Sequence, residues 1–217
     1  MMRTTLLCLA LMAPLIAGEP NSLTPEEKRE GYVLLFNGKN LNGWNGDPEA
    51  WSVEDGAIVG STDHHVIKPN TFLIYKKKYT DFILRADVRL RNGNSGIQFR
   101  STVMPEIGEW VVKGLQADLS DEPGREAWGN FYEERGRSRT MMKTPDEGWL
   151  KAKDVVRMHD WNSYEILAQG HHIRLTLNGV VTIDTTENQS SEGVIALQLH
   201  MGKPMRVEFR TIRIKAE

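Results

Sequence analysis

Cysteine is almost absent from this sequence. The 217 residues contain one cysteine, Cys8, so that no disulfide can form within the chain and the core must supply its stability. An excess of one charge is also absent, because the formal net charge is −2, and this excludes the basic surfaces that bind nucleic acid or anionic membranes. The chain has no H-E-x-x-H, phosphate-loop or G-x-S-x-G motif. The balanced charge favours a neutral or small partner over a polyanionic one.

Long hydrophobic runs are absent too, and the one apolar stretch is short. Arg3 gives a positive start, Leu6–Ala13 is apolar, and Ala17-Gly18 offers small residues where a peptidase can cut. A stretch this short is typical of a secretory signal peptide rather than a membrane span. We therefore predict a cleaved signal peptide over residues 1–18, a secreted or periplasmic location, and no membrane span after cleavage.

Helical periodicity is missing from the rest of the chain, which instead alternates between apolar and polar residues. Residues 82–90 place apolar side chains at every second position, and Arg85, Asp87 and Arg89 lie between them from Leu84 onward. Asp55-Gly56 and Asn178-Gly179 are strong hairpin signals. We predict an all-β fold, a two-sheet antiparallel jelly-roll sandwich, as a single domain over 31–217 after a polar leader at 19–30.

Three segments repeat one pattern, in which a glutamine on the polar side of a strand is followed two residues later by an ionisable residue. The three pairs are Gln98 with Arg100, Gln116 with Asp118, and Gln198 with His200. Solvated sheet faces favour Lys, Glu, Thr and Arg, whereas amides beside an ionisable group are typical of a shielded face that orients a ligand. The pattern predicts that the three strands share one site. In the alternative, they lie apart and each makes local hydrogen bonds.

Residues 129–137, GNFYEERGR, add a dense polar run. Strand alternation places Tyr132 and Glu134 on one side and Glu133 and Arg135 on the other. The run is either a solvated ion-pair cluster of small energetic value or a strand whose acid points into a cleft. The sequence leaves both interpretations open.

Metal-ligand signals are weak. His64-His65 and His171-His172 are interpreted as exposed loop residues, since adjacent side chains on a strand point apart and do not bind one ion together. Asp118, Glu134 and His200 are candidate ligands for a divalent cation if they converge. No other cofactor is indicated.

Six segments, in order, resemble the 3-keto-disaccharide hydrolase family. They are GYVLLFNGKNLNGW, WSVEDGAIVG, DFILRADVRLRNGNSGIQFRS, GLQADLS, WNSYEILAQGHHIRLTLNGV and GVIALQLHMGKPMRVEFRTIRI, from about Gly31 to Ile214. The resemblance implies a concanavalin A-like jelly roll, a secreted or periplasmic location and action on oxidised sugars. GLQADLS and the span 120–160 differ from the corresponding segments of many members. Residue roles known in the family are therefore not carried over to positions in the Trp-rich loops. Positions that fall on family motifs are Gln98, Gln116, Asp118, Gln198 and His200.

A 3-keto sugar permits elimination, because its ketone acidifies the C2 proton, and water can then add back to complete a hydrolysis. Such a route needs a base, a donor to the enolate and an acid for the leaving oxygen. The candidates are His200 as base or acid, Asp118 or Glu134 as rival base, Arg100 for the enolate, Gln98, Gln116 and Gln198 for sugar hydroxyls, and Trp128 or Tyr132 for stacking. The alternative function is a non-catalytic, lectin-like carbohydrate-binding module.

Overall fold

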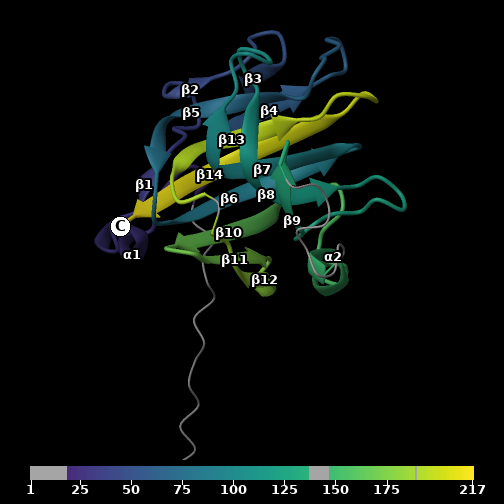
Figure 1. The fold of residues 1–217 in the computed structure, drawn as a ribbon. Helices are drawn as coiled ribbons and strands as arrows, with labels where there is room; N and C mark the ends of the chain where they lie inside the picture. The colour runs from purple at the N-terminus through teal and green to yellow at the C-terminus, as the bar shows by residue number, and fades with distance from the viewer. Residues whose placement is uncertain (1–18, 137–146, 189) are drawn as a thin grey trace, which may run out of the picture.

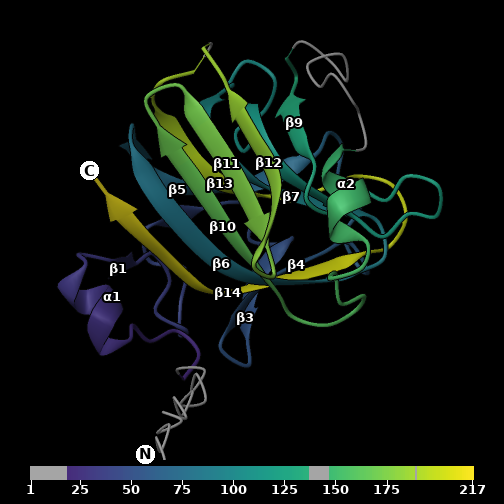
Figure 2. The ribbon, with the colours of Figure 1, turned by 90° about the horizontal axis from the view of Figure 1, so that it is seen from below.

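The alternating segments fold into strands. The computed structural model describes residues 19–136, 147–188 and 190–217, and within these it contains fourteen strands and two short helices (Figure 1). The strands form two antiparallel sheets that stack face to face (Figure 2), which confirms the predicted two-sheet sandwich. The predicted signal peptide at 1–18 lies outside the described residues.

The first sheet, which we name the β6 sheet, has the order β12-β11-β10-β6-β14-β4-β3, and β1 also pairs with β14. Its strands are β1 (Val33–Leu34), β3 (Trp51–Glu54), β4 (Ala57–Ser61), β6 (Phe82–Arg91), β10 (Asn162–Gln169), β11 (His172–Leu177), β12 (Val180–Thr186) and β14 (Arg206–Ala216). Asp55 and Gly56, and likewise Asn178 and Gly179, have positive φ angles at the β3-β4 and β11-β12 turns. Both predicted hairpins are confirmed, since tight hairpin turns require positive φ.

The second sheet, which we name the β7 sheet, has the order β2-β5-β13-β7-β8-β9. Its strands are β2 (Trp44–Asn45), β5 (Thr71–Tyr79), β7 (Asn94–Val103), β8 (Val112–Ser120), β9 (Phe131–Glu134) and β13 (Gly193–Leu199). The helices are α1 (Pro25–Arg29), which Thr24 caps, and α2 (Glu147–Ala152), which contacts β12. The described residues contain no helix with the length and apolar character that crossing a bilayer requires.

The core lies between the sheets and fixes which side chains face outward. Every second residue of β6, from Phe82 to Leu90, is buried, as the alternation predicts. Phe99 of β7 meets Phe82 from the opposite sheet at a ring-centre distance of 6.4 Å, and Phe131 of β9 at 6.2 Å. Since strand neighbours point to opposite faces, an inward Phe99 turns Gln98 toward the other face of the β7 sheet.

Candidate active site

A cavity of about 240 Å³ opens on the polar face of the β7 sheet, and we name it the amide cavity. It brings together most of the side chains predicted to share a site, and they come from three segments of the chain. The predicted residues in its lining are Gln116, Asp118, Tyr132, Glu134, Gln198 and His200. The structure therefore brings these six residues together, and in the described part of the 129–137 run Tyr132 and Glu134 line the cavity, as the cleft interpretation requires. Arg137 lies outside the described residues.

Strand pairing explains this convergence. Gln98 of β7 pairs with Gln116 of β8, which in turn pairs with Tyr132 of β9. On the other flank of β7, Gln98 pairs with Ala196 of β13, two residues before Gln198. Directly paired residues have side chains on the same face of the sheet, about 5 Å apart. Three glutamines that are distant in sequence thus share one surface.

The glutamine side chains form a continuous chain of hydrogen bonds. Gln98 Nε2 donates to Gln116 Oε1 at 2.5 Å, and Gln116 Nε2 donates to Asp118 Oδ1 at 2.9 Å and to Gln198 Oε1 at 3.4 Å. Gln198 Nε2 then donates to Glu134 Oε2 at 3.1 Å. All three amides are almost completely buried. Their donors end on two carboxylates, so the network fixes the orientation of both acids.

Gly96 makes room for this network. It pairs with Asp118 across the β7-β8 ladder. A Cβ atom at this position would lie 2.3 Å from Cδ of Gln116, so the glutamine side chain passes over the bare glycine on its way to Gln198. Gly96 was not among the predicted site residues, although it lies two positions before Gln98 on the same strand.

Asp118 is the most strongly perturbed acid in the cavity. Burial, together with the nearby charge of Glu134, raises its pKa from 3.8 to about 7, against hydrogen bonds from Gln116, from the Leu119 amide and from Asn94. Its backbone carbonyl accepts a 2.7 Å hydrogen bond from the hydroxyl of Tyr164, which reaches across the core from the β6 sheet. Asp118 is therefore rigidly placed and close to the protonation midpoint at neutral pH.

Glu134 and His200 act on each other electrostatically. Burial raises the pKa of Glu134, whereas Arg135, the charge of His200 and a hydrogen bond from Gln198 oppose this rise. His200 follows directly after β13, and its Nδ1 lies 2.6 Å from the carbonyl oxygen of Met201. A carbonyl can only accept, so Nδ1 carries the proton and Nε2 holds the lone pair of the neutral ring.

Arg100 lies outside this cavity, which corrects its predicted placement. The β7-β8 register shifts between Phe99 and Thr102, and Arg100 adopts a φ of +46°. This irregularity breaks the alternation on which the prediction depended. The buried guanidinium donates to Thr80 O at 2.8 Å, Gly170 O at 2.7 Å and Asp81 Oδ1 at 2.9 Å. Arg100 therefore holds loops of the sandwich together and cannot contact an enolate in the cavity.

Two predicted sugar contacts are also corrected. Trp128 is completely buried, stacks on Tyr164 at 6.4 Å and donates from Nε1 to Asp121 Oδ1 at 2.6 Å. No face of its ring is open to a sugar. Gln98 is completely buried behind Gln116, so it supports the network rather than contacting a hydroxyl.

Six residues of the cavity lining were not predicted from the sequence, namely Asn70, Asn94, Ser120, Glu122, Arg125 and Ala127. Among them, Asn70, Asn94 and Arg125 add two amides and a guanidinium to the predicted residues. Asn70 also accepts the Met201 N–H at 2.9 Å and thus fixes the turn that carries His200. Asn70 and Arg125 lie between strands, and Asn94 opens β7, so that strand alternation gives no signal for any of them.

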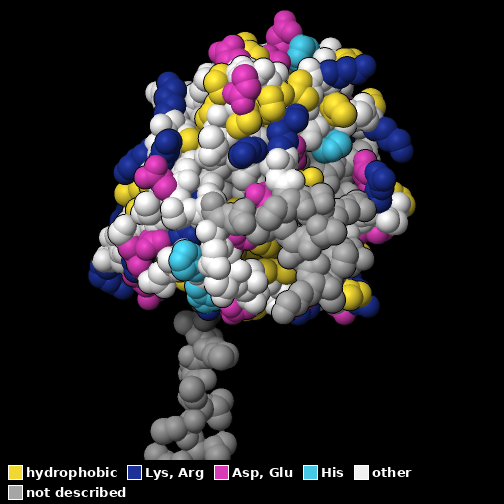
Figure 3. All heavy atoms as spheres, viewed as in Figure 1, with side chains coloured by type: hydrophobic (Ala, Val, Ile, Leu, Met, Phe, Trp, Pro, Cys, Tyr) yellow, Lys and Arg dark blue, Asp and Glu magenta, His cyan; other side chains and the backbone are white. Residues whose placement is uncertain are grey.

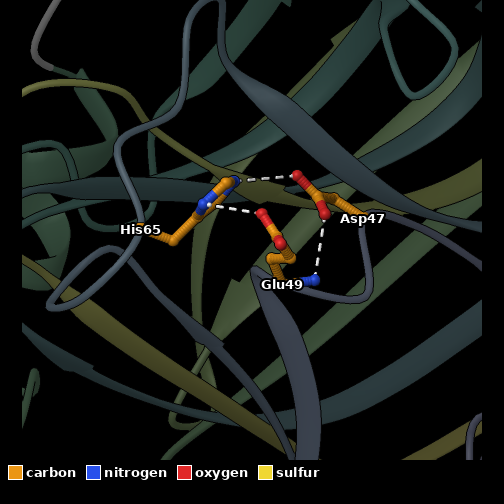
Figure 4. A group of neighbouring side chains, drawn as sticks. All are labelled: Asp47, Glu49 and His65. Atoms are coloured by element: carbon orange, nitrogen blue, oxygen red, sulfur yellow. Dashed lines mark hydrogen bonds and ion pairs between the residues drawn. The ribbon is translucent and has the colours of Figure 1, made fainter.

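A second cluster lies outside the amide cavity (Figure 4). The ring nitrogens of His65 lie 3.1 Å from Asp47 Oδ2 and 3.2 Å from Glu49 Oε2. Within the described part of the chain, this is the one group of three such residues with ligand atoms within 4.8 Å of one another. Asp118, Glu134 and His200 do not meet that criterion. His64 is exposed as interpreted, whereas His65 is half-buried, because it bridges the two carboxylates.

The comparisons with known proteins agree with this architecture. The family model described as "3-keto-alpha-glucoside-1,2-lyase-like domain" matches residues 31–215. A 90-residue segment is 35% identical to a 3-keto-disaccharide hydrolase of Bacteroides thetaiotaomicron and covers 37% of this chain and 31% of that protein. The aligned segment thus spans about a third of that relative.

Solved structures share the fold. A proposed glycosyl hydrolase of Parabacteroides distasonis is 26% identical, with a TM-score of 0.67 over 92% of this chain and 100% of the other. A β-glucanase of Bacillus licheniformis is 11% identical, with a TM-score of 0.50 over 86% and 99% of the two chains. The second likeness shows the fold alone.

Proposed function

Because the chain belongs to the family of 3-keto-alpha-glucoside-1,2-lyase-like domains, we propose that its amide cavity binds a 3-keto-glucoside and cleaves it by elimination followed by hydration. The family and its glycosyl hydrolase-like neighbours indicate a carbohydrate-active protein. The observation that supports the chemistry is the meeting of Asp118, Glu134 and His200 in one cavity, held by an oriented amide network.

His200 is the proposed base. Its Nε2 lone pair removes the C2 proton, and the electron pair of the C–H bond moves toward the C3 carbonyl to form an enolate. Glu134, whose charge interacts with that of His200, stabilises the imidazolium that results. The Arg125 guanidinium supplies a positive donor for the enolate oxygen, the role that the sequence had suggested for Arg100.

Asp118 is the proposed acid. With a pKa of about 7, it carries a proton in a substantial fraction of molecules at neutral pH. When the enolate collapses, the C1–O bond breaks and this proton passes to the departing oxygen, which releases an alcohol and an unsaturated 3-keto sugar. Water then adds its hydroxyl to C1 and a proton to C2, so that the net reaction is hydrolysis.

Release of the leaving group from oxidised and unoxidised substrates tests this function. We expect the purified protein to release the alcohol from 3-keto-glucosides and to leave the parent glucosides intact, because only the ketone acidifies the C2 proton. Parallel reactions with a chelator test the need for a divalent cation. Equal cleavage of the parents would identify an ordinary glycosidase, and tight binding of a 3-keto-glucoside without release would identify a lectin-like module.

A further inference from the structure

A second hollow lies beside the amide cavity. It has a volume of about 300 Å³ and is lined by residues 65–71, before and at the start of β5, and 107–111, between β7 and β8. Asn70 lines both hollows, so the two are neighbours that share one wall. We name the second hollow the apolar trough and define it by Val66, Ile107 and Trp110.

The trough exposes hydrophobic side chains to solvent. Val66 is 82% exposed and Ile107 is 44% exposed, and both line the same hollow as Trp110. Figure 3 shows hydrophobic side chains gathered at the upper end of the molecule, the end at which Figure 1 places the loop between β7 and β8. Single exposed hydrophobic residues are ordinary, whereas several that line one concave surface mark a binding site.

The walls of the trough are held before any ligand arrives. The Trp110 carbonyl accepts the Phe72 N–H of β5 at 2.9 Å, and the Ile107 N–H donates to the Met104 carbonyl at 3.0 Å. On the opposite wall, His65 bridges Asp47 and Glu49 (Figure 4) and thereby anchors the loop that carries Val66. A hollow with fixed walls loses little conformational entropy on binding.

We propose that the apolar trough binds the leaving group of the substrate and selects a second pyranose ring. This inference rests on the proposed function of the amide cavity. Val66, Ile107 and Trp110 offer apolar surface to the C–H face of a sugar ring, while Asp47 and Glu109 line the same hollow, and their carboxylates can accept hydrogen bonds from the sugar hydroxyls. A methyl leaving group has no ring face for these apolar side chains and no hydroxyls for these carboxylates.

Kinetics with two leaving groups tests the trough. We expect wild-type protein to prefer a 3-keto-glucosyl disaccharide over methyl 3-keto-glucoside in kcat/KM, with the difference mostly in KM. Val66→Ser and Ile107→Ser should each lower this preference about five- to tenfold, since each removes apolar contact with the leaving group only. The matched control is Val181→Ser, which alters a residue that is 43% exposed on β12 of the β6 sheet and should keep the wild-type preference.

Binding measurements on an inactive variant separate the hypothesis that the apolar trough binds the leaving group from the hypothesis that the amide cavity catalyses the elimination. In the His200→Ala background, calorimetry should give tighter binding of the disaccharide than of the methyl compound, and Val66→Ser should remove the difference. If Val66→Ser and Ile107→Ser keep the wild-type preference for the disaccharide, by kinetics or by calorimetry, the apolar trough does not bind the leaving group. If wild-type protein cleaves neither compound while the calorimetric preference persists and depends on Val66, the reaction assigned to the amide cavity is wrong and the trough stands.

Discussion

The two sheets are both built from strands that alternate apolar and polar residues, but their polar faces differ in the structure. On the β6 sheet, the outward side chains are arginines and acids that pair across strands, such as Arg85 with Glu165 at 2.8 Å. The side chains of Arg85 and Glu165, and those of Arg210 and Asp87, remain about a quarter to a third exposed. On the β7 sheet, the polar side chains of Gln98, Gln116 and Gln198 are buried and joined in a chain that ends on two acids.

The difference shows that the kind of polar residue on a strand, rather than its alternation with apolar residues, indicates whether the polar face is buried or solvated. Long charged side chains keep their ends in water and gain little from surface ion pairs. Amides are neutral, so they can be buried if each donor and acceptor finds a partner. A strand whose polar positions carry glutamine beside aspartate or histidine therefore indicates a shielded site, whereas arginine and glutamate indicate a solvated face.

The largest expected effect compares one histidine on each sheet. His200→Ala should lower kcat on a 3-keto-glucoside by about a thousandfold, the scale of an acid–base contribution. His172→Ala, which removes a side chain paired with Asp184 at 2.7 Å on the β6 sheet, should leave kcat near wild type. Steady-state kinetics of both variants checks this. Equal losses would mean that the amide cavity is not the reacting site.

A buried arginine of the β7 sheet and an exposed arginine of the β6 sheet should differ in their contributions to stability. Arg100→Met should lower the free energy of unfolding by about 2–3 kcal/mol, because it removes the hydrogen bonds that a fully buried guanidinium donates to Thr80, Gly170 and Asp81. Arg91→Met, which breaks an ion pair with Asp63 whose arginine side chain is 48% exposed, should cost less than about 1 kcal/mol. Urea unfolding measures both values. A small loss for Arg100→Met would contradict its structural role.

The burial of Asp118 should make the free energy of unfolding depend on pH. Its pKa is raised from 3.8 to about 7, so the folded state prefers the protonated acid, and the cost of ionisation appears as pH rises from about 4 to 7. Asp118→Asn should then raise the free energy of unfolding by on the order of 2 kcal/mol at pH 8, allowing for water in the cavity, and hardly at all at pH 4.

The matched control for this pH effect is Asp87→Asn on the outward face of the β6 sheet. Asp87 is paired with Arg210 at 3.6 Å and is about a quarter exposed. Its removal should give no gain in stability at pH 8. A gain for Asp118→Asn that is equal at pH 4 and pH 8 would show that the ionisation of Asp118 is not its source.

Gly96 gives the smallest expected effect. Gly96→Ala should destabilise the protein by about 1–2 kcal/mol, because the new methyl group overlaps the Gln116 side chain. Gln116→Ala removes that overlap, so the double variant should lose less than the sum of the two single losses. Urea unfolding of the three variants completes the cycle. Strict additivity would show that Gly96 does not make room for Gln116.

The sequence predicted the features that depend on local periodicity. Alternation in 82–90 and the hairpins at Asp55-Gly56 and Asn178-Gly179 are confirmed, and the repeated glutamine pattern led to a shared surface. These features could be inferred because side-chain direction in a regular strand depends on position alone. The roles of the cavity residues in catalysis stay proposals.

The remaining features depend on tertiary structure. The bulge that turns Arg100 away is a property of the β7-β8 pairing, and a single strand does not encode it. Trp128 is buried because Tyr164 of the other sheet packs against it. Asn70 and Arg125 enter the cavity from loops, whose directions the sequence pattern does not specify.

Deuterium incorporation at C2 tests the central claim most directly. When the purified protein cleaves a 3-keto-glucoside in heavy water, NMR of the released 3-keto sugar should show deuterium at C2, because the proposed route removes the C2 proton and returns one from solvent. A control without protein corrects for spontaneous exchange of the acidic C2 proton. Release of the alcohol with the original proton retained at C2 would contradict elimination and indicate direct displacement at C1.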